Sequence, residues 1–242
     1  MSISSLSNTT VKQIRALRLR KERERTGLFF AEGIRIVGEA VAQRAAIERL
    51  VVAPELLTSG YGRELVEEWR RQGLALLEVS AAVFASLSLK DGPQGLGAVV
   101  RQRWETLDAL RPGDELCWVA LDAAQDPGNL GTILRTGDAV GAAGLLLLGH
   151  AADPHDPVAL RASMGAIFAQ RLVRTSFAEL LRWKTQHGYT LAGTSDAAPT
   201  DYQAVRYQRP LVLLMGSERE GLAPEQQAAC DVMVSLPMVG RG

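Results

Sequence analysis

Apolar residues recur every three or four positions in several stretches of the chain, and short, nearly continuous apolar runs separate these stretches. In the first hundred residues this alternation predicts helices over residues 9–25, 34–43, 61–71 and 81–87, and strands over residues 27–33, 47–54, 74–80 and 95–102. The first helix has Asn8 or Thr9 as a candidate cap and Val11, Ile14 and Leu17 as its apolar stripe. The pattern indicates a small α/β unit.

The same alternation restarts at Glu115, after a stretch with a Pro-Gly turn. It predicts strands over residues 115–122, 144–149, 171–174, 189–194, 210–216 and 231–237, and helices over residues 129–140, 158–168, 177–186 and 224–229. Apolar strands that alternate with helices are typical of a parallel sheet covered on both faces. We therefore expect an α/β fold with domains at residues 1–103 and 115–242, joined by a linker at residues 104–114.

The length of 242 residues, 47% of them hydrophobic, suffices for one large domain or two small ones. The net charge is zero, but its distribution is uneven, because residues 1–35 contain eight basic residues and only three acidic ones. Such asymmetry favours a nucleic-acid-binding end on an otherwise ordinary body. The alternative is a solvated helix face rich in Arg and Glu.

Several classes of protein are disfavoured. The longest apolar stretch, 139–149, is shorter than the about 20 residues of a membrane span, and the opening residues lack the apolar core of a secretory signal, so we expect a cytoplasmic protein with no membrane contact. Cys117 and Cys230 are interpreted as reduced, buried thiols rather than as catalytic or bridged ones. His150, His155 and His187 show no metal-ligand spacing, so we predict no metal and place these side chains in loops or in solvent.

In open parallel sheets, ligands bind at the carboxyl ends of the strands. The unusual polar and glycine-rich segments fall there: "DAAQDPGNLG" from Asp122, "TSDAAPTD" from Thr194, "GSEREG" from Gly216 and "PMVGRG" from Pro237. Glycine-rich loops let a ligand approach backbone amides closely. None of these segments fits the dinucleotide-binding or the P-loop fingerprint, which disfavours a dehydrogenase.

Four segments, "QDPGNLGTILRTGDAVGA", "LRASMGAIF", "LVLLMGSEREGLAPE" and "VSLPMVGRG", resemble in this order the motifs of the SpoU/TrmH family of RNA ribose 2′-O-methyltransferases. The N-terminal segment "RKERERTGLFFAEGIRIVGEAV" resembles the RNA-binding domain of that family, with its Phe-x-x-Glu-Gly signature at Phe29, Glu32 and Gly33. The resemblance spans nearly the whole chain.

The resemblance implies a SPOUT-type parallel sheet with a deep trefoil knot, preceded by a small, ribosomal-protein-like RNA-binding domain. It also implies S-adenosylmethionine as the methyl donor, a homodimer with the active site beside the subunit interface, and methylation of a ribose in structured ribosomal or transfer RNA. The alternative function is an RNA-binding or assembly protein that keeps the fold without methyl transfer.

Three residues are candidates for catalysis. From the residues alone, Asn129 fits a helix N-cap and Arg135 a surface or ion-paired side chain; the resemblance places both in the active site. The family's Arg is often assigned as a general base, but a guanidinium stays protonated in proteins, so a clamp on an RNA phosphate is the alternative. Glu218 either holds loop amides or orients Arg135 or Asn129.

The resemblance further implies cofactor contacts and RNA contacts. Cofactor contacts are expected from Thr194, Gly216, Gly221, Leu236 and Met238. RNA contacts are expected from Lys12, Arg15, Arg18, Arg35, Arg161 and Ser163, the first four of them on phosphates. For Arg161 and Ser163 the alternative is a contact with the first motif.

The third motif of the family continues past its Pro-Met with further residues that complete the knot and the cofactor pocket. This sequence stops at "PMVGRG", where that continuation begins. We expect an omitted tail; the alternative is a damaged family member.

Overall fold

The computed structural model describes residues 2–237, which form two compact units. Of these, the first unit contains residues 2–102 together with residues 153–169, and the second contains residues 103–152 and 170–237. The segment 153–169, which the sequence pattern assigned to the second domain, thus packs with the first unit. The expected domain limits at residues 103 and 115 stay a prediction.

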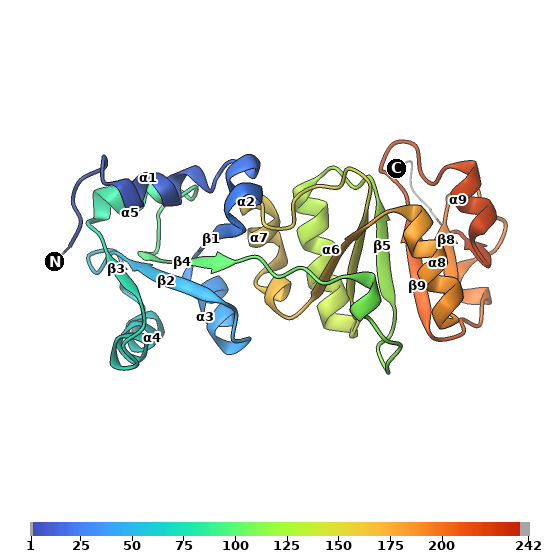
Figure 1. Ribbon diagram of the computed structural model, residues 1–242, viewed down its shortest axis with the longest axis horizontal. Coiled ribbons are helices and arrows are strands. Elements are labelled where there is room, and N and C mark those ends of the chain that lie inside the picture. The colour runs from blue at the N-terminus through green and yellow to red at the C-terminus, as the bar shows by residue number, and fades with distance from the viewer. Residues whose placement is uncertain (1, 238–242) are drawn as a thin grey trace. The chain divides into compact units, whose positions relative to one another are not determined.

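A four-stranded mixed sheet with the order β1-β4-β2-β3 forms the centre of the first unit. Its strands are β1 (Leu28–Glu32), β2 (Ile47–Val52), β3 (Leu76–Glu78) and β4 (Leu96–Arg101). The helices α1 (Thr9–Ala16) and α5 (Ala81–Leu87) cover one face, and α3 (Ile34–Ala42) and α4 (Gly60–Arg71) cover the other (Figure 1). Strand β4 runs antiparallel to β1 and β2.

The apolar stripe of α1 is buried as its spacing predicts. Val11, Ile14 and Leu17 pack with Val83 and Phe84 of α5 in one core cluster. The side chain of Asn8 caps α1 by accepting hydrogen bonds from the backbone N–H groups of Thr10 and Val11, which confirms one of the two expected caps.

The single helix expected over residues 9–25 is wrong: the chain forms α1 and then α2 (Arg20–Thr26). The physical reason is a buried charge. The guanidinium of Arg23, which is 1% exposed, donates hydrogen bonds from Nη1 to the backbone oxygens of Leu17 (3.0 Å) and Arg18 (2.8 Å). These carbonyls lie just after α1. The guanidinium of Arg23 bonds them in place of the backbone N–H groups that would do so if the helix continued.

The helix expected over residues 158–168 is also interrupted. It forms α7 (Pro157–Ser163) and the 3₁₀ helix η2 (Ala166–Phe168), with left-handed backbone at Met164 and Gly165 between them. A Cβ atom on Gly165 would lie 2.7 Å from the Cβ of Glu39, so this turn packs against α3 too closely for a larger residue.

The second unit contains a six-stranded parallel sheet with the order β10-β8-β9-β5-β6-β7, as the apolar strands predict. The strands are β5 (Trp118–Asp122), β6 (Gly144–Leu148), β7 (Arg171–Thr175), β8 (Thr190–Thr194), β9 (Leu211–Met215) and β10 (Val232–Val234). Its helices are α6 (Pro127–Val140), α8 (Phe177–His187) and α9 (Pro224–Ala229), with the 3₁₀ helices η1 (Leu107–Ala109) and η3 (Tyr202–Ala204). The trefoil knot stays a prediction.

Side chains from β5, β6, β9 and α8 form the core of the second unit. Trp118, Leu146 and Leu214 pack there with Leu180 and Trp183 of α8. Part of the expected linker joins this unit: Glu105 pairs with Val173 of β7 in a parallel bridge, and its carboxylate accepts two hydrogen bonds from Arg171. Neither Cys117 nor Cys230 is in a disulfide. No helix among residues 2–237 is long and apolar enough to cross a membrane.

Candidate active site

The turn that follows β5 places Asn129 near the start of α6. Helix α6 begins at Pro127, two residues earlier than expected, because the side chain of Asp126 caps it by accepting a hydrogen bond from the Asn129 N–H (2.7 Å). The interpretation of Asn129 as the N-cap is therefore wrong. Since Asp126 caps the helix, the side-chain amide of Asn129 is left for another partner.

That partner is Glu218, which lies in the loop after β9. The Nδ2 of Asn129 donates a hydrogen bond to Oε1 of Glu218 over 3.4 Å. The backbone N–H of Glu218 itself has the largest effect in lowering the pKa of its carboxyl, and the amide of Asn129 and the backbone N–H groups of Gln125 and Asp126 add to it against a partial opposition from burial. Glu218 is therefore ionised at neutral pH and joins two strand-end loops.

Arg135 lies in the middle of α6 and is exposed. Among the described residues its guanidinium takes part in no hydrogen bond or ion pair, and it contacts neither Asn129 nor Glu218 in this way. Of the three expected catalytic residues, the structure thus brings together Asn129 and Glu218 within one chain. The role of Arg135 stays a prediction.

A cavity of about 470 Å³ lies where β8, β9 and β10 end. It is lined by four of the five residues expected to contact the cofactor, Thr194, Gly216, Gly221 and Leu236, and by Glu218. Met238, the fifth, lies outside the described residues. This volume is in the range of roughly 300–1,000 Å³ that is typical of sites for small molecules and cofactors.

The loop from Ser217 to Gly221 closes on itself beside the cavity. The backbone N–H of Ser217 donates to the oxygen of Gly221 (3.2 Å), and the N–H of Gly221 donates back to the oxygen of Ser217 (3.0 Å). A Cβ atom at Gly216 would overlap backbone atoms of Gly221 and Leu222. Position 216 therefore requires glycine, and Gly221, with φ +67°, adopts the left-handed region that favours glycine.

The charges around this cavity are mainly negative. The lining contains three carboxylates, Asp196, Glu218 and Glu220, and one cation, Arg219. A negative lining disfavours phosphate-bearing nucleotides and fits a donor with a positive sulfonium centre. The residues present therefore fit S-adenosylmethionine in both size and charge.

Gln226 supports the site, although the sequence pattern did not single it out. Its side chain is 5% exposed; Oε1 accepts a hydrogen bond from the Ala223 N–H (2.8 Å), and Nε2 donates to Oδ2 of Asp122 (2.9 Å). This amide ties the start of α9 to the carboxyl end of β5. One local signal could have indicated it: a glutamine three residues after the residue that precedes a helix is typical of a helix start.

The residues expected to contact RNA divide into two groups. Lys12 and Arg35 are exposed and have no hydrogen-bonded or ion-pair partner in the part of the chain that the structure describes. Arg15 donates to Oγ of Ser86 (2.7 Å), and Arg18 donates to the backbone oxygens of Ser86 and Ser88 (both 2.8 Å), so these two guanidiniums hold the C-terminal end of α5.

The two expected RNA contacts in the segment 153–169 also differ. Arg161 is half-buried, and no hydrogen bond of its guanidinium occurs among residues 2–237. Ser163 is fully buried; its Oγ donates to the oxygen of Leu160 (2.9 Å) and accepts from the Gly165 N–H (3.4 Å). Within this subunit Ser163 shapes the turn after α7. RNA binding by all six residues stays a prediction.

Metal ligands do not gather in the described structure. No group of three or more His, Cys, Asp or Glu side chains within residues 2–237 could hold a metal ion. His155 lies in the loop before α7, one of the two places expected for it, but it is buried rather than in solvent: it is 3% exposed, and its ring packs on Phe29 at a centroid distance of 4.6 Å.

The parallel α/β sheet, the cavity at its strand ends and the self-closed glycine loop agree with the SPOUT-type methyltransferase that the sequence resembles. A model of the SpoU rRNA Methylase family matches residues 117–242, and a model of the MRM3-like substrate binding domain matches residues 8–98. The chain belongs to the SpoU rRNA methylase family.

Relatives and solved structures agree with this assignment. The chain is 32% identical to the 23S rRNA (uridine(2479)-2′-O)-methyltransferase of Streptomyces viridochromogenes, over 91% of this chain and 78% of that one. It is 27% identical to the 23S rRNA (guanosine(2553)-2′-O)-methyltransferase RlmP of Bacillus subtilis, over 99% and 91%. The AdoMet-bound rRNA methyltransferase from Sinorhizobium meliloti superposes with a TM-score of 0.89, at 35% identity, over 100% of this chain and 90% of that one.

Proposed function

We propose that this chain transfers a methyl group from S-adenosylmethionine to a ribose 2′-hydroxyl of 23S ribosomal RNA. The observation that carries the proposal is the cavity at the strand ends, whose negative lining and glycine loop suit a sulfonium donor. The relatives named as 23S rRNA 2′-O-methyltransferases support the choice of RNA and of the methylated atom.

S-adenosylmethionine, when bound, would supply an electrophilic methyl group for the 2′-oxygen and would leave as a neutral thioether, with the hydroxyl proton passing to water. The task of the protein is alignment of the two reactants. Thr194, Gly216, Gly221 and Leu236 hold the donor. The hydrogen bond between Asn129 and Glu218 holds the loop after β9 beside the start of α6.

Arg135 acts on the RNA in this proposal. A guanidinium stays protonated, so it serves as a cation rather than as a base: it clamps an adjacent phosphate and stabilises the developing alkoxide. The exposure of Arg135, and the lack of any partner for it within residues 2–237, support this role because they leave all five N–H donors for a ligand.

The assembly that we propose is a homodimer in the cytoplasm, where ribosomal RNA and S-adenosylmethionine meet. The family resemblance supports the dimer, with the active site completed beside the subunit interface. Sedimentation velocity of the full chain tests the dimer directly.

The transfer itself is tested with methyl-labelled S-adenosylmethionine and 23S rRNA, followed by mapping of 2′-O-methylated positions. The Arg135→Ala variant should lose transfer while its affinity for S-adenosylmethionine, measured by calorimetry, stays within about two-fold of wild type. Arg135→Lys is the matched control, which keeps the charge but loses the bidentate fork. A fully active Arg135→Ala variant would contradict the role given to this residue.

A further inference from the structure

A second candidate site lies in the first unit, where a small recess collects positive charge. Its charged lining consists of Arg18 at the end of α1, Lys90 in the loop between α5 and β4, Arg161 of α7, and one carboxylate, Glu32 of β1. The remaining lining is apolar. Three cations from segments far apart in the sequence therefore share one opening.

The single carboxylate does not neutralise these cations by pairing. Glu32 accepts hydrogen bonds from the hydroxyl of Ser88 and, at 3.3 Å, from the backbone N–H of Leu89. Neither Lys90 nor Arg161 forms an ion pair or a side-chain hydrogen bond within the described part of the chain. The recess therefore keeps a net positive charge.

Arg18 also lacks full compensation. Its Nη2 donates to two backbone oxygens, but its Nε is buried and has no hydrogen-bond partner among residues 2–237. Burial, followed by the neighbouring charge of Arg15, lowers the pKa of Arg18, and Glu32 opposes this effect only in part. An anion in the recess would relieve this repulsion.

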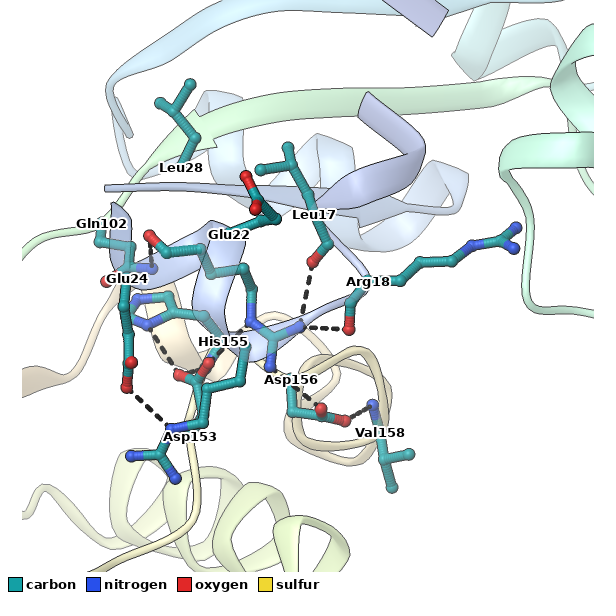
Figure 2. A network of polar contacts seen from close by, with 12 residues as sticks. Leu17, Arg18, Glu22, Glu24, Leu28, Gln102, Asp153, His155, Asp156 and Val158 are labelled. Atoms are coloured by element: carbon teal, nitrogen blue, oxygen red, sulfur yellow. Dashed lines mark hydrogen bonds and ion pairs between the residues drawn. The ribbon is translucent and has the colours of Figure 1, made fainter. Parts of the chain in front are cut away.

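A buried network of hydrogen bonds and ion pairs links the backbone of Arg18 to Asp153 and Asp156 (Figure 2). Arg23 donates from Nη1 to the backbone oxygen of Arg18, from Nε to Oδ2 of Asp153 (2.7 Å), and from Nη2 to Oδ2 of Asp156 (3.1 Å). Asp156 is the N-cap of α7, with its Oδ1 accepting from the Val158 N–H (2.9 Å). One guanidinium thus fixes the backbone of Arg18 relative to the helix that bears Arg161.

The size of the recess limits what can enter. Its volume is about 20 Å³, slightly above the roughly 10–15 Å³ that a single water molecule requires. A base or a ribose is too large, whereas one oxygen atom of an anion fits while the rest of the anion stays at the mouth. Apolar walls strengthen the attraction, because the effective dielectric constant is lower there than in water.

We propose that this recess binds one non-bridging oxygen of an RNA backbone phosphate, shared by Arg18, Lys90 and Arg161. The inference rests on the proposed function, since it takes the same RNA as its ligand. The bound phosphate sets the register of the substrate on the first unit, as backbone contacts do in nucleic-acid complexes.

The test uses the full chain with the variants Lys90→Gln, Arg161→Gln and the double variant, none of which removes a side-chain hydrogen bond that the described structure contains. Affinity for a 23S rRNA fragment is measured at several salt concentrations without S-adenosylmethionine. Each single variant should weaken binding on the order of ten-fold. The fold-loss of affinity in the double variant should be clearly smaller than the product of the two single fold-losses, because both cations contact one phosphate.

The salt dependence of the affinity reports how many phosphates the protein contacts. The slope of log affinity against log salt should fall by about 0.7–0.9 in the double variant, the value for one phosphate. Lys21→Gln on α2, an exposed lysine outside the recess lining, is the matched control and should change affinity less than either single variant. Unchanged affinity of both single variants, or independent losses with a slope change of two phosphates, would overturn the shared site.

Failure of the inference is distinguishable from failure of the proposed function. A wild-type chain that methylates 23S rRNA, with variants that bind like wild type, contradicts the recess alone. A wild-type chain that binds neither S-adenosylmethionine nor the RNA contradicts both. Circular dichroism and calorimetry with S-adenosylmethionine on each variant exclude misfolding as the cause of a loss.

Discussion

The side-chain amide of Asn129 donates a hydrogen bond to the carboxylate of Glu218 across 89 positions of sequence, and so joins the first βα turn to the loop that borders the cofactor cavity. This contact exists because Asp126, not Asn129, caps α6. The amide acts as a donor, and the pKa of Glu218 is lowered in part by it.

The Asn129→Asp variant should therefore impair transfer more than Asn129→Ala. An aspartate cannot donate to Glu218 and places a like charge beside it, which raises the pKa of Glu218 and weakens the link between the loops. We expect at least about a ten-fold loss of kcat/KM, equivalent to about 1.4 kcal/mol. The acidic limb of the pH–rate profile should move to higher pH.

The matched control for this substitution is Asn8→Asp. Asn8 caps α1, a position where aspartate serves equally well, so its replacement should leave transfer and stability nearly unchanged. An Asn129→Asp variant with a wild-type pH–rate profile would show that the hydrogen bond has no part in the reaction.

The glycine loop permits a second prediction, on cofactor binding. In Gly216→Ala the new methyl group overlaps the backbone of Gly221 and Leu222, so the loop must move away from the cavity. Affinity for S-adenosylmethionine should fall by at least about ten-fold, or about 1.4 kcal/mol, in calorimetry. Gly60→Ala is the control, since a Cβ there meets no atom within 4 Å. If the two variants bind S-adenosylmethionine with equal affinity, the loop at Gly216 does not shape the cofactor site.

Local signals predicted much of the fold. The helices at Ala81–Leu87 and Pro224–Ala229 have the bounds that the sequence indicates, because the cap at Ser80 and the proline at the first helical position mark where they begin. The strand-end rule indicated the segments that begin at Thr194 and Gly216. The individual cofactor contacts came from the family resemblance, and four of them, Thr194, Gly216, Gly221 and Leu236, line the cavity.

Contacts between distant segments account for the failures. The stripe of Val11, Ile14 and Leu17 continues the helical spacing, and the Arg23 side chain that interrupts the helix is held by Asp153, 130 positions away. The partner of Gln226 is 104 positions away, and periodicity carries no information on such pairs. The sequence predicts an exposed Arg18 in a basic stretch, yet its guanidinium is half-buried and donates to two backbone carbonyls.

The buried pair of Arg23 and Asp153 leads to a prediction on stability and pH. Burial alone would raise the pKa of Asp153, but hydrogen bonds from His155 and Arg23 outweigh it and hold that pKa well below the ordinary value of 3.8. Because the folded pKa lies below the unfolded one, the ionised carboxylate stabilises the fold fully above the unfolded pKa. This stabilisation is lost as pH falls through the folded pKa.

Asp153→Asn should therefore lower the free energy of unfolding at pH 7 by about 3 kcal/mol, since it leaves Arg23 buried with a weaker partner. The difference from wild type should shrink as the pH is lowered from 5 towards 2. Urea denaturation at each pH measures it, with Asp91→Asn, at an exposed position, as the control. A deficit that stays constant over this pH range would mean that the charge of Asp153 is not what matters.

The two groups of basic residues on the first unit should respond differently to mutation. Lys12 and Arg35 are exposed and have no partner within residues 2–237, so Lys12→Gln and Arg35→Gln should weaken binding of a 23S rRNA fragment without a change in Tm. Removal of one cation from a phosphate should reduce the salt slope by roughly 0.7–0.9. Arg15→Gln, in contrast, removes the hydrogen bond that joins α1 to Ser86 in the last turn of α5, so its Tm should fall whether or not RNA is present. Fluorescence anisotropy over a salt series, together with thermal unfolding of each variant, separates these outcomes. If Lys12→Gln and Arg35→Gln bind with the wild-type salt slope, the exposed basic residues of α1 and α3 do not face the RNA. The phosphate contacts of this unit must then be sought at the recess around Lys90 and Arg161.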